Sequence, residues 1–265
     1  MPTQQEITWY DEPLYYDIVF DEDTEGEASF LEAMHERHGR GGKKRRAVLE
    51  VACGSGRLVE NMAARGWSTA GFDANPATLK FARDRLRQTG EKATLWQDRM
   101  ENFKVPRDRR FDLAHCLVST FKYLPSEADA VSCLKRVAGS LHPGGIFVLG
   151  IHLTDYSNPR ITHERWVAER DGIEVVCNTR TWPADRRRRT EKVRSRIRAR
   201  HPGGKEVQQE TIWTFRTYSA AQVRRMVRGV PELCLVACHD FYHDPESGRE
   251  LDDSYADVVL VLRRG

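Results

Sequence analysis

The chain has 265 residues and a formal net charge of +3 at neutral pH, a length that can bury about 70 to 75 % of the unfolded surface in one elaborated domain. No apolar run approaches about 18 residues, and the N-terminus lacks the basic and apolar regions of a signal peptide, so we expect a cytoplasmic protein that engages no membrane. The small charge excess does not by itself indicate nucleic acid, and six cysteines without a Cys-x-x-Cys pair favour reduced thiols over disulfides.

The first 44 residues precede the first predicted strand and form an N-terminal arm rich in aromatic side chains. Four of these stand shortly before Asp17: Trp9, Tyr10, Tyr15 and Tyr16. Aromatic rings in such a segment either cover a ligand or pin the arm to the core, and both interpretations remain open here.

Residues 48–57, with the sequence VLEVACGSGR, are the most informative stretch. A buried-strand pattern containing Glu50 leads into Gly54 and Gly56, and apolar residues at helical spacing follow from Leu58. A further strand is predicted over residues 68–73, so the unit runs strand, glycine turn, helix, strand. Two nearly adjacent glycines let the backbone approach a nucleotide-like ligand closely.

Further segments follow in a compatible order. A short apolar strand precedes Asp98, a longer apolar strand ends near Cys116, and Ser126 is placed to cap a helix. The turn His142-Pro143-Gly144-Gly145 then precedes a strand predicted over residues 146–151. This alternation of strands and helices indicates an α/β fold.

Taken together, residues 45–155 resemble the class I S-adenosylmethionine-dependent methyltransferases, of the type that modifies small molecules. The resemblance implies that S-adenosyl-L-methionine is the cofactor, that S-adenosyl-L-homocysteine is the product, and that the glycine turn holds the cofactor. The turn residues that match this motif are Glu50, Ala52, Cys53, Gly54 and Gly56. Ala52 stands where the family usually has its first glycine, and its one methyl group is compatible with a slightly less open turn.

The same resemblance assigns the remaining cofactor contacts. Asp73 lies 23 residues after Glu50, where the family's acid accepts hydrogen bonds from both ribose hydroxyls, and Ala74 follows it. A single carboxylate suits a vicinal diol because it can accept two hydrogen bonds. The resemblance places four residues at the adenine slot or in the arm that covers the sulfonium: Asp98, Arg99 and Met100 at the adenine, and Tyr16 in the arm. Cys116, from the fourth strand, completes the expected set.

From residue 172 to residue 216 the pattern changes to period two, which predicts an antiparallel meander of three strands over residues 172–182, 190–201 and 205–216. In the middle strand, four arginines from Arg194 to Arg200 alternate with small and apolar residues. Glutamates and a glutamine alternate along the next strand, so cross-strand pairing is favoured over an anion site. The opposite, apolar face must pack on the core, a substrate pocket or a second copy.

The complete expectation is a Rossmann-like, seven-stranded α/β methyltransferase sheet with helices on both faces and an antiparallel β-meander insertion after strand five. The arm is residues 1–44, the core is residues 45–155 and 217–265, and the insertion is residues 156–216. The layout is similar to that of the sugar N,N-dimethyltransferases, in which the insertion builds acceptor-binding or dimer surface. A monomer or a homodimer is compatible with this arrangement.

Methyl transfer from a sulfonium is an in-line displacement, so alignment and desolvation supply much of the rate and a base is optional. His152 lies just past the fifth strand, at the carboxyl edge where α/β sheets bind ligands, and is the preferred catalytic candidate together with Tyr16. His115 is expected inside the fourth strand. Four further residues resemble metal ligands but are expected at the surface, so no metal is predicted: His239, Asp240, His243 and Asp244.

The predicted function is therefore methyl transfer to a small-molecule amine or hydroxyl. Three alternatives are weaker. An RNA or other nucleic-acid methyltransferase is supported only by arginine runs such as Arg186–Arg189, and a cofactor-binding protein without turnover is compatible with Ala52. A dehydrogenase is disfavoured by Val59, which stands where its turn would need a third small residue.

Overall fold

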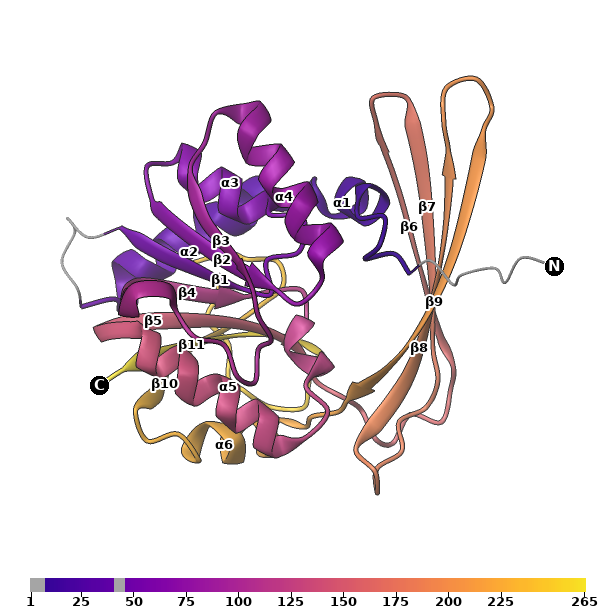
Figure 1. Ribbon diagram of the computed structural model, residues 1–265. Coiled ribbons are helices and arrows are strands. Elements are labelled where there is room, and N and C mark those ends of the chain that lie inside the picture. The colour runs from indigo at the N-terminus through magenta and orange to yellow at the C-terminus, as the bar shows by residue number, and fades with distance from the viewer. Residues whose placement is uncertain (1–7, 41–45) are drawn as a thin grey trace.

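The computed structural model describes residues 8–40 and 46–265. Two sheets stand side by side with a short helix of the arm between them (Figure 1). Sheet A has seven strands in the order β10-β11-β5-β4-β1-β2-β3, and sheet B has four in the order β6-β7-β8-β9. This confirms the predicted fold class.

Sheet A is parallel except for β11, which pairs antiparallel with both of its neighbours, β5 and β10. Its strands are β1 (Ala47–Val51), β2 (Ser68–Asp73), β3 (Ala93–Gln97), β4 (Phe111–Cys116), β5 (Leu141–His152), β10 (Leu233–Asp240) and β11 (Asp257–Arg264). The strand order reverses between β1 and β4, and such a reversal opens a crevice at the carboxyl edge of the sheet.

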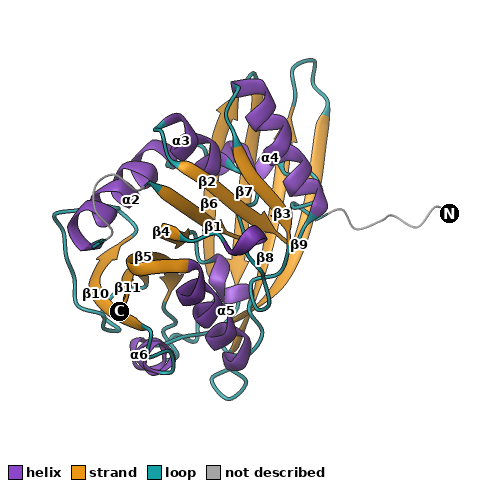
Figure 2. Cartoon of the chain, turned by 60° about the vertical axis from the view of Figure 1, so that its left-hand side comes forward, coloured by secondary structure: helices purple, strands orange, loops and turns teal. Residues whose placement is uncertain are grey.

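Helices cover both faces of sheet A (Figure 2). One face carries α2 (Thr24–His38), α3 (Arg57–Ala64) and α4 (Pro76–Thr89); the other carries α5 (Glu127–Ser140) and α6 (Ala220–Arg228). Alternate strand residues divide between two hydrophobic clusters, because successive side chains point to opposite faces. Two single-turn 3-10 helices, η1 (Pro106–Asp108) and η2 (Thr120–Tyr123), flank β4.

Local sequence explains several of these boundaries. Ser126 caps α5 by accepting a hydrogen bond from the Asp129 amide, as predicted, and Ser219 caps α6 in a capping box with Gln222. The fifth strand departs from the prediction at its start. Helix α5 ends at Ser140 and β5 begins at Leu141, so the expected turn at residues 142–145 lies within the strand, beside a register irregularity.

Sheet B consists of β6 (Thr162–Arg170), β7 (Ile173–Thr181), β8 (Thr190–Arg200) and β9 (Glu206–Arg216), all antiparallel. The prediction of three strands was wrong because β6 was missed. Its sequence, THERWVAER, is largely exposed and carries few of the buried alternate residues from which the other strands were inferred. As predicted, Arg196 and Arg200 lie opposite Glu210 and Glu206 across the β8–β9 pair.

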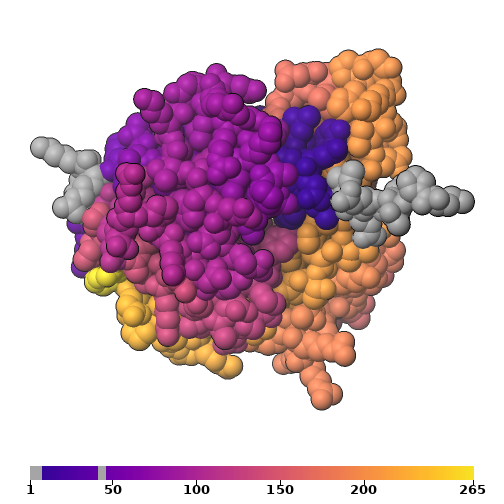
Figure 3. Space-filling view, viewed as in Figure 1, coloured from indigo at the N-terminus to yellow at the C-terminus, as the bar shows by residue number. Residues whose placement is uncertain are grey.

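The arm helix α1 (Leu14–Phe20) covers the apolar face of sheet B. Figure 3 shows the arm, in indigo, wedged between the core and the orange strands of the insertion. Within residues 8–40 and 46–265, no helix has both the length and the apolar character needed to cross a bilayer.

Candidate cofactor and acceptor site

The glycine turn follows β1 at the point where the strand order reverses. Gly56 has a φ of +73°, and a Cβ built on it would lie 2.7 Å from the Cβ of Ala82 in α4, so only glycine fits without displacement. Gly54 has a φ of +50°, and its Cβ would lie 2.8 Å from the hydroxyl of Tyr16. The backbone of the turn therefore packs directly against α4 and the arm, with no room for side chains at the two glycines.

Ala52 also adopts the left-handed conformation, with a φ of +58°. A non-glycine residue pays about 1 to 2 kcal/mol for that conformation. Alanine in place of the family's glycine at position 52 therefore adds backbone strain as well as a methyl group.

Asp73 is held by three groups around the turn. Its Oδ2 accepts a hydrogen bond from the Gly54 amide at 2.9 Å, and its Oδ1 accepts from the Asn75 amide at 2.8 Å and the Thr78 hydroxyl at 3.2 Å. Burial raises the pKa of this carboxyl, while the amide hydrogen bonds oppose the shift. The carboxylate is therefore fixed at the crevice, with lone pairs left for a further donor.

Glu50 is a second acid beside the crevice. Its Oε2 is buried without a hydrogen-bond partner among the described residues, and burial raises the pKa of the carboxyl to about 8, against the opposing charge of Arg57. Arg57 itself forms a buried pair with Glu27 at 2.5 Å. A neutral carboxyl with one unpartnered oxygen is suited to a cationic ligand, whose charge would favour its ionisation.

The predicted adenine-side residues lie at the ends of β2 and β3. The Asp98 carboxylate accepts hydrogen bonds from the amides of Arg99 and Lys104, each at 2.9 Å, and so holds its own loop. The Arg99 side chain pairs with Glu101, whereas Met100 packs against the hydrophobic core. Ala74 is exposed, and its carbonyl accepts from the side chain of Gln97.

Two residues of the expected cofactor set, Cys53 and Cys116, and the neighbouring His115 lie in the interior. Cys53 and Cys116 are buried, and burial raises the pKa of both thiols, so they stay protonated. His115 is buried in β4, as predicted, and burial lowers its pKa to about 3. A neutral, enclosed imidazole supports packing beneath the crevice and no acid–base role.

An aromatic junction connects the arm, η2 and sheet B; we define it as Trp9, Tyr10, Tyr16, Tyr123, Trp213 and Phe215. The hydroxyls of Tyr10 and Tyr123 are 2.5 Å apart, and the rings of Trp9 and Trp213 have centroids 5.0 Å apart. The Tyr16 hydroxyl lies over Gly54 and has no hydrogen-bond partner among the described residues. The arm aromatics therefore both pin the arm and bring one unpartnered donor to the glycine turn.

Asp17 fixes the arm in place. It is fully buried and accepts hydrogen bonds from Arg85 of α4 at 2.5 Å and Arg170 of β6 at 2.7 Å. Charge-assisted hydrogen bonds of this kind are stronger than neutral ones. One carboxylate thus ties the arm to both the core and the insertion.

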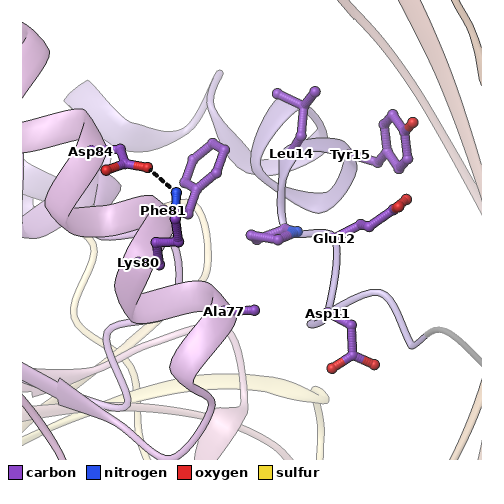
Figure 4. Close-up of a pocket in the computed structure, with 9 residues that line it drawn as sticks. Asp11, Glu12, Leu14, Tyr15, Ala77, Lys80, Phe81 and Asp84 are labelled. Carbon is purple, nitrogen blue, oxygen red and sulfur yellow. Dashed lines mark hydrogen bonds and ion pairs between the residues drawn. The ribbon is translucent and has the colours of Figure 1, made fainter.

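A groove of about 410 Å³ runs between the start of α1 and the outer side of α4. Figure 4 shows Glu12 and Tyr15 on one wall, with Phe81 and the Lys80–Asp84 ion pair on the other. It shares no residue with the predicted cofactor set.

His152 lies at the carboxyl end of β5, as predicted, and forms a hydrogen bond through its Nδ1 with Asp257 of β11. The Ser119 hydroxyl accepts a hydrogen bond from the His152 amide at 2.7 Å, and the Phe241 ring lies 4.9 Å from the imidazole. The hydrogen bond from His152 lowers the pKa of Asp257.

The four metal-like residues need a partial correction. His239 and Asp240 are buried rather than at the surface, and both histidine rings, His239 and His243, pack at 5.2 Å against Phe30. The Nδ1 of His239 lies 3.2 Å from the Asp244 carbonyl oxygen. No group of metal-ligating side chains was found in the described parts of the chain.

Sequence reasoning missed the residues that join distant segments. Lys122 of η2 pairs with Glu191 of β8 at 2.5 Å, with only 4 % of its side chain exposed. Asp257 and Tyr123 were likewise not singled out. Their roles depend on which segments meet in three dimensions, and no local pattern carries that information.

The fold and site together define a class. A seven-stranded sheet with one antiparallel strand next to its edge, a glycine turn after β1 and an acid after β2 form the Rossmann-like methyltransferase arrangement.

Comparison with known proteins agrees with this class. Residues 48–145 match the family model of a methyltransferase domain. A ubiquinone biosynthesis O-methyltransferase from Nitrosomonas europaea is 31 % identical over 100 residues, which is 38 % of this chain and 42 % of that protein. The match therefore spans less than half the length of the curated relative.

Solved structures resemble nearly the whole chain. A S-adenosylmethionine-dependent methyltransferase from Clostridium acetobutylicum has a TM-score of 0.76 at 19 % identity, covering 97 % of this chain and 99 % of that one. CalS10, an amino pentose methyltransferase from Micromonospora echinaspora involved in calicheamicin biosynthesis, has a TM-score of 0.69 at 16 % identity, with full coverage of both chains (100 % each). The chain therefore contains a methyltransferase domain over residues 48–145 and shares its fold with S-adenosylmethionine-dependent methyltransferases, in agreement with the predicted family and cofactor.

Proposed function

We propose that this chain transfers a methyl group from S-adenosylmethionine to a small-molecule acceptor. The observation that carries the proposal is the arrangement at the glycine turn, where the fixed Asp73 carboxylate and the unpartnered Tyr16 hydroxyl converge on Gly54. Asp73 would bind the ribose, and Glu50 would face the cationic part of the cofactor. The proposed cofactor contacts also include the other residues that the sequence predicts in the glycine turn and at the adenine slot.

A small acceptor is supported by the charges of sheet B. Arg194 and Arg196 pair with Glu210, and Arg200 pairs with Glu174 at 3.1 Å, so three of the four alternating arginines in β8 are engaged within the sheet. The relatives named above are a ubiquinone-pathway O-methyltransferase and an amino pentose methyltransferase, both of which act on small molecules. We propose that the insertion and the arm, in contact through the aromatic junction, form the acceptor side with His152. The cytoplasmic location and the oligomeric state stay predictions.

The test is calorimetric titration of the purified chain with S-adenosylmethionine and S-adenosylhomocysteine, followed by transfer of labelled methyl groups to small molecules and to tRNA. Saturable binding of both compounds and labelling of small molecules would support the proposal. Labelling of tRNA alone would favour the nucleic-acid alternative, and binding without any transfer would favour a cofactor-binding protein without turnover.

A further inference from the structure

His152 and Asp257 form a dyad whose position is set by the sheet. They are direct partners in the antiparallel pairing of β5 with β11, so their side chains project from the same face. The contact joins the Nδ1 of His152 to the Oδ1 of Asp257. Because both residues stand on strands of the central sheet, the imidazole has a fixed orientation that an isolated surface histidine would lack.

The dyad stands at the edge where the acceptor would bind. β5 is two strands from β1, about 10 Å in the direction of the interstrand hydrogen bonds. Ser119, which accepts from the His152 amide, lies one residue before η2, and η2 carries Tyr123 of the aromatic junction. The charge of Lys122 in η2 contributes to lowering the pKa of Asp257. Ser119 and η2 therefore connect the dyad to the aromatic junction, which lies over the glycine turn.

The imidazole has one engaged nitrogen and one available. Nδ1 faces Asp257, whereas Nε2 has no hydrogen-bond partner in the part of the chain that the structure describes, and 43 % of the side chain is exposed. A carboxylate on Nδ1 holds the proton there, so Nε2 presents its lone pair. Such an arrangement is that of a general base.

We propose that Asp257 is the positioning residue for His152 and that the acceptor group is a hydroxyl. This inference rests on the proposed methyltransferase function. In the step, the acceptor O–H bond breaks and its proton goes to Nε2, while the oxygen forms a bond to the methyl carbon. The carbon–sulfur bond breaks with its electron pair going to sulfur, which yields S-adenosylhomocysteine, and the imidazolium then releases its proton to water. A neutral amine attacks through its own lone pair and does not need this base.

The test combines a spectroscopic and a kinetic measurement on the full chain. Nitrogen-15 NMR of labelled histidines, assigned with His152→Gln, should show His152 protonated at Nδ1 in the wild type and a mixture of tautomers in Asp257→Asn. Protonation mainly at Nε2 in the wild type would overturn the proposal. Glu250→Gln removes an exposed carboxylate from the loop that precedes β11, whose side chain forms no hydrogen bond or ion pair among the described residues, and it should leave the tautomer unchanged.

The kinetic probes are catechol, 4-nitrocatechol and benzylamine. At pH 7, Asp257→Asn should lower kcat for catechol about 10- to 100-fold with little change in KM, and His152→Gln should lower it at least as much. The loss should shrink for 4-nitrocatechol, which is already largely ionised. Methylation of benzylamine alone, no methylation of any probe by a wild type that binds S-adenosylmethionine, or equal losses for both catechols would refute the hydroxyl assignment. Absence of S-adenosylmethionine binding in the wild type would instead refute the proposed function.

Discussion

The glycine turn of sheet A and the junction of sheet B with the arm are held by different interactions. The turn depends on backbone geometry: left-handed residues, amide hydrogen bonds to Asp73 and close packing against Ala82. The junction of sheet B with the arm and η2 depends on side chains from distant segments. These are the rings of the aromatic junction, the Lys122–Glu191 pair and the arginines that bind Asp17. A cofactor that is the same across a family can be bound by a fixed backbone, whereas the proposed acceptor side depends on side chains of the insertion and the arm.

The largest effect is expected at the junction. Lys122→Met leaves Glu191 buried without its partner, which should cost about 3 kcal/mol in the free energy of unfolding. Urea denaturation measures the loss, and Lys122→Met combined with Glu191→Leu should recover most of it. S-adenosylmethionine affinity of the folded variant should change little. A loss below about 1 kcal/mol would mean that the pair does not dock sheet B on the core.

At the turn, Asp73→Ala should weaken S-adenosylmethionine binding by about 1.5 to 3 kcal/mol, because hydrogen bonds to a charged group are lost. Calorimetry on the wild type and the variant measures the difference. Asp84→Ala removes a partly exposed carboxylate on the neighbouring helix α4; this variant is the control and should bind normally. Equal affinity in the wild type and Asp73→Ala would show that the ribose site lies elsewhere.

Glu50 gives the turn a pH dependence. Its pKa rises from 4.5 to about 8 on folding, so the folded state retains a proton that the unfolded state has lost. Its contribution to stability is fully present below pH 4.5 and is lost as pH rises through about 8, with a slope of up to about 1 kcal/mol per pH unit.

Glu50→Gln should remove this slope between pH 5 and pH 8, as measured by urea denaturation at each pH. A stability difference between the wild type and Glu50→Gln that stays constant over that range would contradict the assignment; the wild-type slope alone also contains the opposing contribution of His115. S-adenosylmethionine binding should also release a proton from the wild type but not from the variant, which calorimetry in buffers of different ionisation enthalpy detects.

The smallest effect on cofactor affinity is expected at Tyr16, whose hydroxyl joins the aromatic junction to the glycine turn. Tyr16→Phe removes a hydroxyl that has no described partner, so the free energy of unfolding should stay the same or rise slightly, while cofactor affinity falls by about 1 kcal/mol. Tyr15→Phe is the matched control: its hydroxyl bonds His201 at 3.0 Å, away from the turn. If both variants bind the cofactor equally well, the Tyr16 hydroxyl has no role there.

The same difference explains what could be predicted from the sequence. Strands β1 to β5 and the glycine turn were recognisable because their chemistry is local: periodicity, caps and glycine spacing lie within a few residues of one another. Strand β6 was missed because both of its faces are largely exposed, which removes the alternating pattern.

Acceptor-side partners require long-range information. His152 was singled out from its place after a strand, but its partner Asp257 lies 105 residues away and meets it only through the register of β5 and β11. Likewise, Asp17 was noted beside Tyr16, yet Arg85 and Arg170 could not be assigned to it from spacing. Pairings of this kind follow from topology, which a single sequence does not specify.

The position of Asp17 has a thermodynamic consequence. Because one buried carboxylate is bonded to α4 and to β6 at once, the core and the insertion are energetically linked through the arm. A ligand that binds only under the ordered arm stabilises that state by RT ln(1 + [L]/Kd), and the gain extends to strands it never touches. Cofactor binding would thus make thermal unfolding more cooperative: sheets A and B would unfold together, at a temperature that depends on ligand concentration.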